Sequence, residues 1–236
     1  MRSGVGDAED IAPHGIQMNH ELKGVGKNLQ DHIGVVSQFA STKPVTLHRS
    51  ATMFRTALAG IEYLLLGTGD AANPPTAGGA FIKSHPDKDI PDMQIHYVSI
   101  AVPDVHGRAD IPTEHGFSSI VYACRPQSRG HLTLKSPNSE DAPLMFPNYL
   151  SEEQDLIDTR NGFRETRRVF MQEAFDEYRG DQLKPGLDVN IDDDQELDQW
   201  IRETGETLYH PIGTCKMGSD DMSVTNEHGQ VHGVSG

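Results

Sequence analysis

The apolar residues between Arg49 and Leu66 recur at three- and four-residue spacing. On a helix, this spacing gathers the apolar side chains on one face. The residues concerned are Met53, Phe54, Ala57, Leu58, Ile61, Leu64 and Leu65. Gly67 and Gly69 follow directly, and glycine commonly ends a helix because it adopts the left-handed conformation without steric cost. The pattern therefore predicts one helix over residues 49–66.

Segments rich in β-branched and aromatic residues follow in the middle of the chain, and such residues favour strands. They are "MQIHYVSIA" (93–101), "FSSIVYACRP" (117–126) and "GHLTLKS" (130–136), with "NPPTAGGAFIKS" (73–84) as a loop that enters another strand. In the third segment, Leu132 and Leu134 alternate with polar residues, which is typical of a half-buried strand. No helical pattern separates these segments, so we expect an antiparallel sheet.

Two helices are expected after the strands. Ser151 and Gln154 fit a capping box at the start of the first, and residues 192–205 carry the second. The apolar stripe of the second helix is Leu197, Trp200 and Ile201. Gly205 fits its C-terminal cap, and the acidic run Asp192–Asp194 fits a solvated helix start, because carboxylates favour helix N-termini. The order of elements predicts an α+β fold in which helices flank an antiparallel sheet.

The composition narrows the class of protein. The 236 residues allow one large domain or two small ones, and the formal net charge of −15 argues against nucleic acid and anionic membranes as partners. No signal peptide is visible, and the longest apolar run is too short to cross a bilayer. The two cysteines, Cys124 and Cys215, form no disulfide framework. We expect a cytoplasmic protein, or one held at a membrane through an electron-transfer partner.

Several kinds of active site are missing from the sequence. The twelve histidines include no H-E-x-x-H, and no paired C-x-x-C occurs, so we expect no metal site. The serine-hydrolase motif G-x-S-x-G is absent as well. A Cys–His nucleophile is disfavoured because Cys215 follows His210 by only five positions. Gly24 and Gly26 begin a dinucleotide fingerprint, but Leu29 stands where its third glycine belongs.

The segment "LYHPIGTCKMG" (208–218) is the strongest remaining candidate. Pro211 restricts the backbone next to His210, while Gly213 and Gly218 permit close approach of the chain. A rigid loop of small residues with one imidazole suits a site where a planar ligand lies against the backbone. Taken alone, the motif leaves two interpretations open: a hydrogen-bonded structural histidine and a catalytic base.

Six segments, in order along the chain, resemble the glucose–methanol–choline (GMC) oxidoreductase family. They are "SGVG" (3–6), "GVGKNLQDH" (24–32), "RPQSRGHLTLKS" (125–136), "FPNYLSEEQD" (146–155), "YHPIGTCKMG" (209–218) and "VHGVSG" (231–236). Each is a weak match by itself, and six in family order are a specific one. Within the family, the spacing is most similar to choline dehydrogenases and bacterial alcohol dehydrogenases. The resemblance implies FAD as cofactor and alcohol oxidation as the reaction.

The resemblance also implies a domain organisation. Residues 1–34 would be the trailing part of the FAD-binding domain, residues 35–206 the substrate-binding domain, and residues 207–236 a catalytic-loop segment that returns to the FAD-binding domain. The family's dinucleotide fingerprint precedes the region that this chain resembles, and its second catalytic residue, an Asn or His, follows it. We therefore expect a C-terminal fragment whose N-terminal FAD-domain half is missing.

Three residues receive roles from the resemblance. His210 is implied as the base that removes the hydroxyl proton of the alcohol before hydride passes to the flavin. His96, in "MQIHYVS", is implied as a substrate-binding residue that orients the alkoxide, with a structural sheet histidine as the equal alternative. Tyr209 is implied as a cofactor-binding residue. Cys215 is expected to be a packed loop residue.

The expected substrate is a primary or small alcohol. Many choline-oxidising members of the family carry a glutamate before the glycine pair that precedes "FIKS", and here Thr76 and Ala77 stand in that neighbourhood without an acid. Choline stays possible through aromatic faces alone. The alternative function is a non-catalytic substrate-domain module that binds no flavin without the missing half. The electron acceptor is not specified by these residues.

Overall fold

The computed structural model describes residues 1–74, 76–102 and 114–235, and the chain divides into two compact units. Unit 1 comprises Met1–Asp31, Pro126–Glu152 and Tyr209–Gly236, and unit 2 comprises His32–Arg125 and Glu153–Leu208. Residues 126–152 group with unit 1 because their backbone forms hydrogen bonds with other segments of that unit. For example, the Leu132 N–H donates to the Gly26 carbonyl at 2.7 Å.

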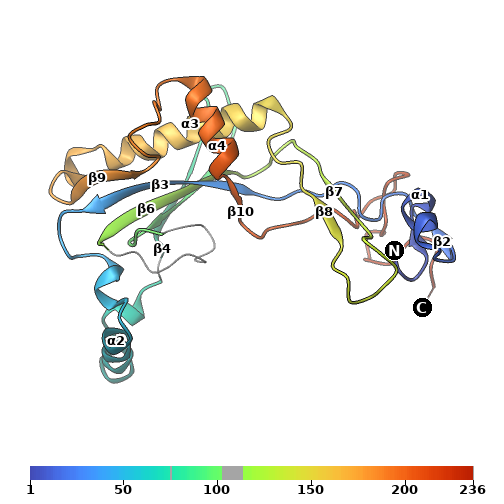
Figure 1. The fold of residues 1–236 in the computed structure, drawn as a ribbon, viewed down its shortest axis with the longest axis horizontal. Coiled ribbons are helices and arrows are strands. Elements are labelled where there is room, and N and C mark those ends of the chain that lie inside the picture. Colours follow the sequence, from blue (N-terminus) through green and yellow to red (C-terminus); the bar gives the residue numbers. More distant parts are fainter. Residues whose placement is uncertain (75, 103–113, 236) are drawn as a thin grey trace. The chain divides into compact units, whose positions relative to one another are not determined.

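Unit 2 is built on a sheet in which every described strand pair is antiparallel (Figure 1). The strands are β3 (Ile33–Ser41), β4 (Thr76–Ile82), β5 (Met93–Val98), β6 (Gly116–Ala123), β9 (Arg179–Lys184) and β10 (Glu206–Thr207). Their order is β10-β3-β6-β5-β4, and β9 pairs with β3. The predicted antiparallel sheet and the strands at β4, β5 and β6 are confirmed. Pro75, which the prediction included, lies outside the described residues.

Two of the sheet's features differ from the prediction. The long strand β3 was missed, because it is buried almost throughout and Gly34, Ser37 and Gln38 interrupt its apolar pattern. The segment "GHLTLKS" does form a strand, β7 (His131–Thr133), but it pairs with β8 (Leu144–Phe146) in unit 1 and not with the large sheet. Alternation of apolar residues predicts a strand without specifying its partner, which explains the error.

Helices α3 (Glu153–Phe170) and α4 (Asp194–Thr204) cover one face of this sheet (Figure 1). Gly162 lets α3 approach closely, since a Cβ there would lie 2.7 Å from Met93 Cε and 3.2 Å from Val121 Cγ2. An aromatic cluster fills the end of the same layer. It consists of Phe39, Phe117 and Phe170, with Tyr97, Phe175 and Tyr178 packed against it. The short 3₁₀ turn η4 (Glu173–Phe175) follows α3.

The starts of these two helices were predicted with different success. Asp193 caps α4 by accepting hydrogen bonds from the backbone N–H groups of Gln195 and Glu196, so the acidic run is a helix start as predicted. The capping box at α3 is wrong. The helix begins at Glu153, and Gln154 Nε2 donates forward to Asp158 Oδ1 at 2.8 Å instead of back to the start.

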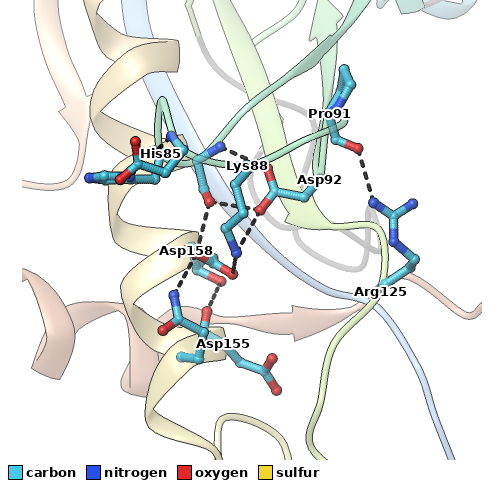
Figure 2. Close-up of polar contacts among 11 residues, drawn as sticks. His85, Lys88, Pro91, Asp92, Arg125, Asp155 and Asp158 are labelled. Carbon is cyan, nitrogen blue, oxygen red and sulfur yellow. Dashed lines mark hydrogen bonds and ion pairs between the residues drawn. The ribbon is translucent and has the colours of Figure 1, made fainter.

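A polar network joins the connection between β4 and β5 to α3 (Figure 2). Lys88 Nζ lies 2.8 Å from Asp158 Oδ2 and 3.2 Å from Asp92 Oδ2. The Ser84 hydroxyl lies 2.8 Å from Asp158 Oδ1 and 2.7 Å from Asp92 Oδ2. The hydrogen bond to Asp158 raises the pKa of Lys88. Burial works against the charge of Asp92, but hydrogen bonds from Ser84 and Lys88 hold its pKa below the usual value. The network fixes the start of β5 on the helix layer.

Helix α2 (Met53–Leu66) confirms the predicted helix but not the burial of its apolar face. It lies apart from the sheet, between the 3₁₀ turns η2 (Leu47–Ser50) and η3 (Asp70–Ala72) (Figure 1). Met53 is 90% exposed and Leu64 is 82% exposed. Arg49 and Asp70 form an ion pair at the base of the helix. No helix in the described part of the chain is long and apolar enough to cross a membrane.

Unit 1 consists of short elements joined by backbone hydrogen bonds. They are β1 (Val5–Gly6), α1 (Ala8–Ile11), the 3₁₀ turn η1 (Ala12–His14), β2 (His20–Glu21), β7 and β8. Strands β1 and β2 are parallel, while β7 and β8 are antiparallel. Isolated bridges join Leu29 to Gly130 and Gln30 to Ile212. Most residues of the six motif segments thus lie in unit 1, while His32, Arg125 and residues 153–155 lie in unit 2.

Replacement of Phe163 by Ala is expected to lower the free energy of unfolding by about 3–5 kcal/mol, because its fully buried ring packs on Trp200. Leu64→Gln on α2 should change it by less than about 0.5 kcal/mol, because that side chain is exposed. Denaturant unfolding of the 236-residue chain measures both. A large loss in the Leu64 variant would contradict the exposed position of α2.

Candidate functional site

The loop from Tyr209 to Gly218 lies against the segment Gly24–Gln30. Ile212 and Gln30 exchange two backbone hydrogen bonds of 2.8 and 2.9 Å, and Gly26 N–H donates to Thr214 C=O at 2.8 Å. Gly213 has a φ of +94°, and a Cβ there would lie 2.3 Å from Asn28 O. Only glycine fits such an approach. The sequence motifs "GVGKNLQDH" and "YHPIGTCKMG" therefore form one packed structure that carries His210.

The carboxylate of Asp31 holds the backbone at His210. Its Oδ1 accepts the His210 N–H at 2.9 Å, and its Oδ2 accepts the Tyr149 hydroxyl at 2.5 Å. The preceding residue, Tyr209, has a φ of +59°, a left-handed conformation that costs a non-glycine residue about 1–3 kcal/mol. Hydrogen bonds to a charged acceptor offset a cost of that size. The His210 side chain is exposed, and Tyr209 is 62% exposed beside it.

His96 lies in unit 2, on the face of the sheet opposite α3. Successive residues of a strand point to opposite faces. Met93 and Val121 meet Gly162 of α3, so Gln94, His96 and Tyr122 point the other way. His96 Nε2 lies 2.8 Å from the Tyr122 hydroxyl, and the two rings stack at 5.5 Å between centroids. His96 is thus tied to a tyrosine of the neighbouring strand.

Tyr122 also contacts His32, which directly precedes β3. The ring centroids of these two residues lie 4.8 Å apart. His32 Nε2 is 3.0 Å from Cys124 O, and because a carbonyl only accepts, this nitrogen carries the proton. Tyr122 is 2% exposed, and burial raises its pKa to about 12. The phenol therefore keeps its proton throughout the physiological pH range.

The predicted site residues are distributed over both units. His210 and Tyr209 belong to unit 1, where His210 meets Asp31, and His96 belongs to unit 2, where it meets Tyr122. Sequence reasoning missed Asp31 and Tyr122 as site residues. Asp31 belongs to the "GVGKNLQDH" motif, which supported the family resemblance but did not assign a function to this residue. Tyr122 stood in a predicted strand, where the missing information was the strand register.

Among the described residues, no group of three His, Cys, Asp or Glu side chains could hold a metal ion. Both cysteines are free thiols, with Cys215 exposed on the loop and Cys124 half-buried. The expectation that Cys215 is a packed loop residue is therefore wrong, because its side chain is exposed. Burial raises the pKa of Cys124, which makes it a poor nucleophile.

Comparison with known proteins supports the predicted resemblance. Residues 126–236 match the model of the GMC oxidoreductase family, and the predicted resemblance is confirmed. The whole chain is 42% identical to an oxygen-dependent choline dehydrogenase of Pseudomonas fluorescens (strain SBW25) and covers 41% of it. It is 40% identical to the protein of that name in Escherichia coli (strain K12) and covers 42% of that protein.

Solved structures agree on the fold. The formate oxidase of Aspergillus oryzae RIB40 superposes with a TM-score of 0.86 at 19% identity, over 99% of this chain and 45% of that one. Pyridoxine 4-oxidase from Mesorbium loti gives 0.76 at 21% identity, over 98% of this chain and 40% of that one. The curated relatives are enzymes, and this chain spans about two fifths of their length.

Asp31→Ala should loosen the His210 loop, because a hydrogen bond to a charged acceptor is lost. Amide hydrogen exchange at His210 is expected to become roughly 10–100-fold faster, which corresponds to about 1.5–3 kcal/mol. The matched control is Asp221→Ala, an exposed aspartate of the same unit. Equal exchange at His210 in both variants would show that Asp31 does not hold the loop.

Proposed function

We propose that the chain is part of an FAD-dependent oxidoreductase that acts on CH–OH groups and oxidises a primary alcohol. The observation that carries the proposal is the exposed imidazole of His210, whose backbone is held by Asp31 on a loop packed without room for side chains at Gly213. Kinship with GMC oxidoreductases supports the cofactor and the reaction class.

The proposed domain organisation starts from the sequence prediction, in which residues 1–34 and 207–236 belong to the FAD-binding domain and residues 35–206 to the substrate-binding domain. Chain outside these 236 residues would supply the remainder of the FAD-binding domain. The compact units support the boundaries near 31 and 208, but group residues 126–152 with unit 1. We therefore include residues 126–152 on the flavin side of the proposal.

The residues of the His210 loop fit a flavin ring. Tyr209 is 62% exposed and Ile212 is 63% exposed. An aromatic and an aliphatic side chain close to His210 in the sequence are therefore accessible to a ligand. Such side chains suit the face of a planar ring. We assign cofactor contact to Tyr209 on this ground. When bound, FAD supplies the hydride acceptor.

His210 would act as the general base. An alcohol is a poor hydride donor while it keeps its hydroxyl proton, and an imidazole within hydrogen-bond reach can take that proton. The Asp31 carboxylate accepts the His210 backbone N–H at 2.9 Å and so positions the residue on its loop. His96 would bind the substrate by orienting the alkoxide oxygen as it forms.

Choline and other small primary alcohols are the proposed substrates. The names of the curated relatives support choline. Thr76, at the start of β4, offers no carboxylate to pair with a quaternary ammonium group, and the side chain of Ala77 lies outside the described part of the structure. Aromatic faces can hold such a cation without a countercharge. The residues of β4 therefore favour a neutral small alcohol over choline.

His210→Ala in the full-length enzyme is expected to slow flavin reduction by alcohol by roughly 10²–10⁴-fold, the range for loss of a general base. Stopped-flow absorbance under anaerobic conditions measures the rate. His228→Ala, at an exposed histidine of the same unit, serves as the matched control and should keep the original rate. If His210→Ala binds flavin normally and loses less than about tenfold, His210 is a structural loop residue and not the base.

A further inference from the structure

Tyr122 stands between two histidines on the face of the sheet opposite α3. In the strand register, Tyr122 pairs with Gln94 of β5 and with Gly34 of β3. His96 and His32 are each two residues from these partners, so both rings point to the same face as Tyr122. Tyr122 stacks on His96 and contacts His32 at 4.8 Å. The three rings come from β5, from β6 and from the residue that directly precedes β3.

His96 has a large side chain beside it on the β6 side and none on the β4 side. On the β4 side its register partner is Gly79, which contributes no side chain. On the β6 side its register partner is Ile120, and the diagonal neighbour Tyr122 reaches the ring with its hydroxyl at 2.8 Å. The tyrosine ring cannot move aside, because it is 2% exposed. The orientation of the His96 ring is therefore restrained from the β6 side.

The Tyr122 hydroxyl also affects which ring nitrogen of His96 carries the proton. Burial keeps Tyr122 in its phenol form, since its pKa is raised to about 12. A phenol that donates to Nε2 leaves the proton of a neutral imidazole on Nδ1. His32 is held in the other tautomer, with its proton on Nε2, by the Cys124 carbonyl. His32 Nε2 thus meets a carbonyl, which only accepts, whereas His96 Nε2 meets a hydroxyl, which can donate or accept.

We infer that Tyr122 is the positioning residue for His96: its hydroxyl donates to Nε2, fixes the ring orientation and selects Nδ1 as the nitrogen that carries the proton. The inference rests on the proposed function, in which His96 orients the alkoxide oxygen. Tyr122 acts through His96 and does not itself contact the substrate. A tyrosine ring that is already buried loses little conformational entropy when its hydroxyl holds a neighbouring ring in place.

The test is a double-mutant cycle in the full-length, flavin-loaded enzyme. Tyr122→Phe keeps the ring and its stacking but removes the hydroxyl. Flavin reduction by alcohol is expected to slow by roughly 3–10-fold, the worth of one neutral hydrogen bond. In a His96→Ala background, the same change should cost less than about twofold, because the group through which Tyr122 acts is gone. Tyr97→Phe, on the opposite face of the sheet, is the matched control and should keep the original rate.

The outcomes separate this inference from the proposed function. A slow His96→Ala variant beside a Tyr122→Phe variant of unchanged rate overturns the role of Tyr122 and leaves the proposed function standing. An equal loss from Tyr122→Phe in both backgrounds also overturns it, since Tyr122 would then act independently of His96. A His96→Ala variant with the original rate overturns the roles of both residues, while the His210 variant still tests the base.

A second measurement needs no tyrosine variant. The nitrogen-15 spectrum of the histidine-labelled full-length enzyme reports which ring nitrogen is protonated. The His96 signals are identified by their loss in His96→Asn. We expect the tautomer with the proton on Nδ1, and a proton on Nε2 would overturn the inference.

Discussion

The carboxylate of Asp31 is the interaction on which the proposed active site depends most. It accepts the His210 backbone N–H and the Tyr149 hydroxyl, so one side chain joins three separate segments of unit 1. His210 follows a tyrosine in the left-handed conformation, which is unfavourable without such support. The same loop packs so closely that a Cβ at Gly213 has no room. A base held in this way loses little orientation when a substrate binds.

The sheet of unit 2 divides its roles between its two faces. One face carries α3 and α4 and the aromatic cluster around Phe170, and the Lys88 network fixes the start of β5 to α3. The opposite face carries His96 and Tyr122. The register of β5 and β6 brings the Tyr122 hydroxyl to 2.8 Å from His96 Nε2 on the second face. Because successive side chains of a strand point to opposite faces, the residues that stabilise unit 2 and the residues proposed to act on the substrate lie on different faces of the sheet.

The sequence predicted the local elements better than their partners. Apolar spacing identified α2, and β-branched residues identified β5 and β6. The pattern of α2 could not say whether other residues cover its apolar side chains, and those side chains are exposed. Strand β3 was missed because Gly34, Ser37 and Gln38 interrupt its apolar run. His210 could be singled out from its motif, whereas its partner Asp31 lies 179 positions away in the chain, a contact that only the folded backbone reveals.

We propose that this chain belongs to an enzyme that moves a hydride from an alcohol to a flavin with a histidine as the base. The most direct test is anaerobic mixing of the full-length flavoprotein with small primary alcohols, choline among them, while the flavin absorbance is followed. Bleaching of the flavin by an alcohol, slower when the carbinol carbon carries deuterium, is the predicted result. A flavin that stays oxidised with every alcohol tested would contradict the account.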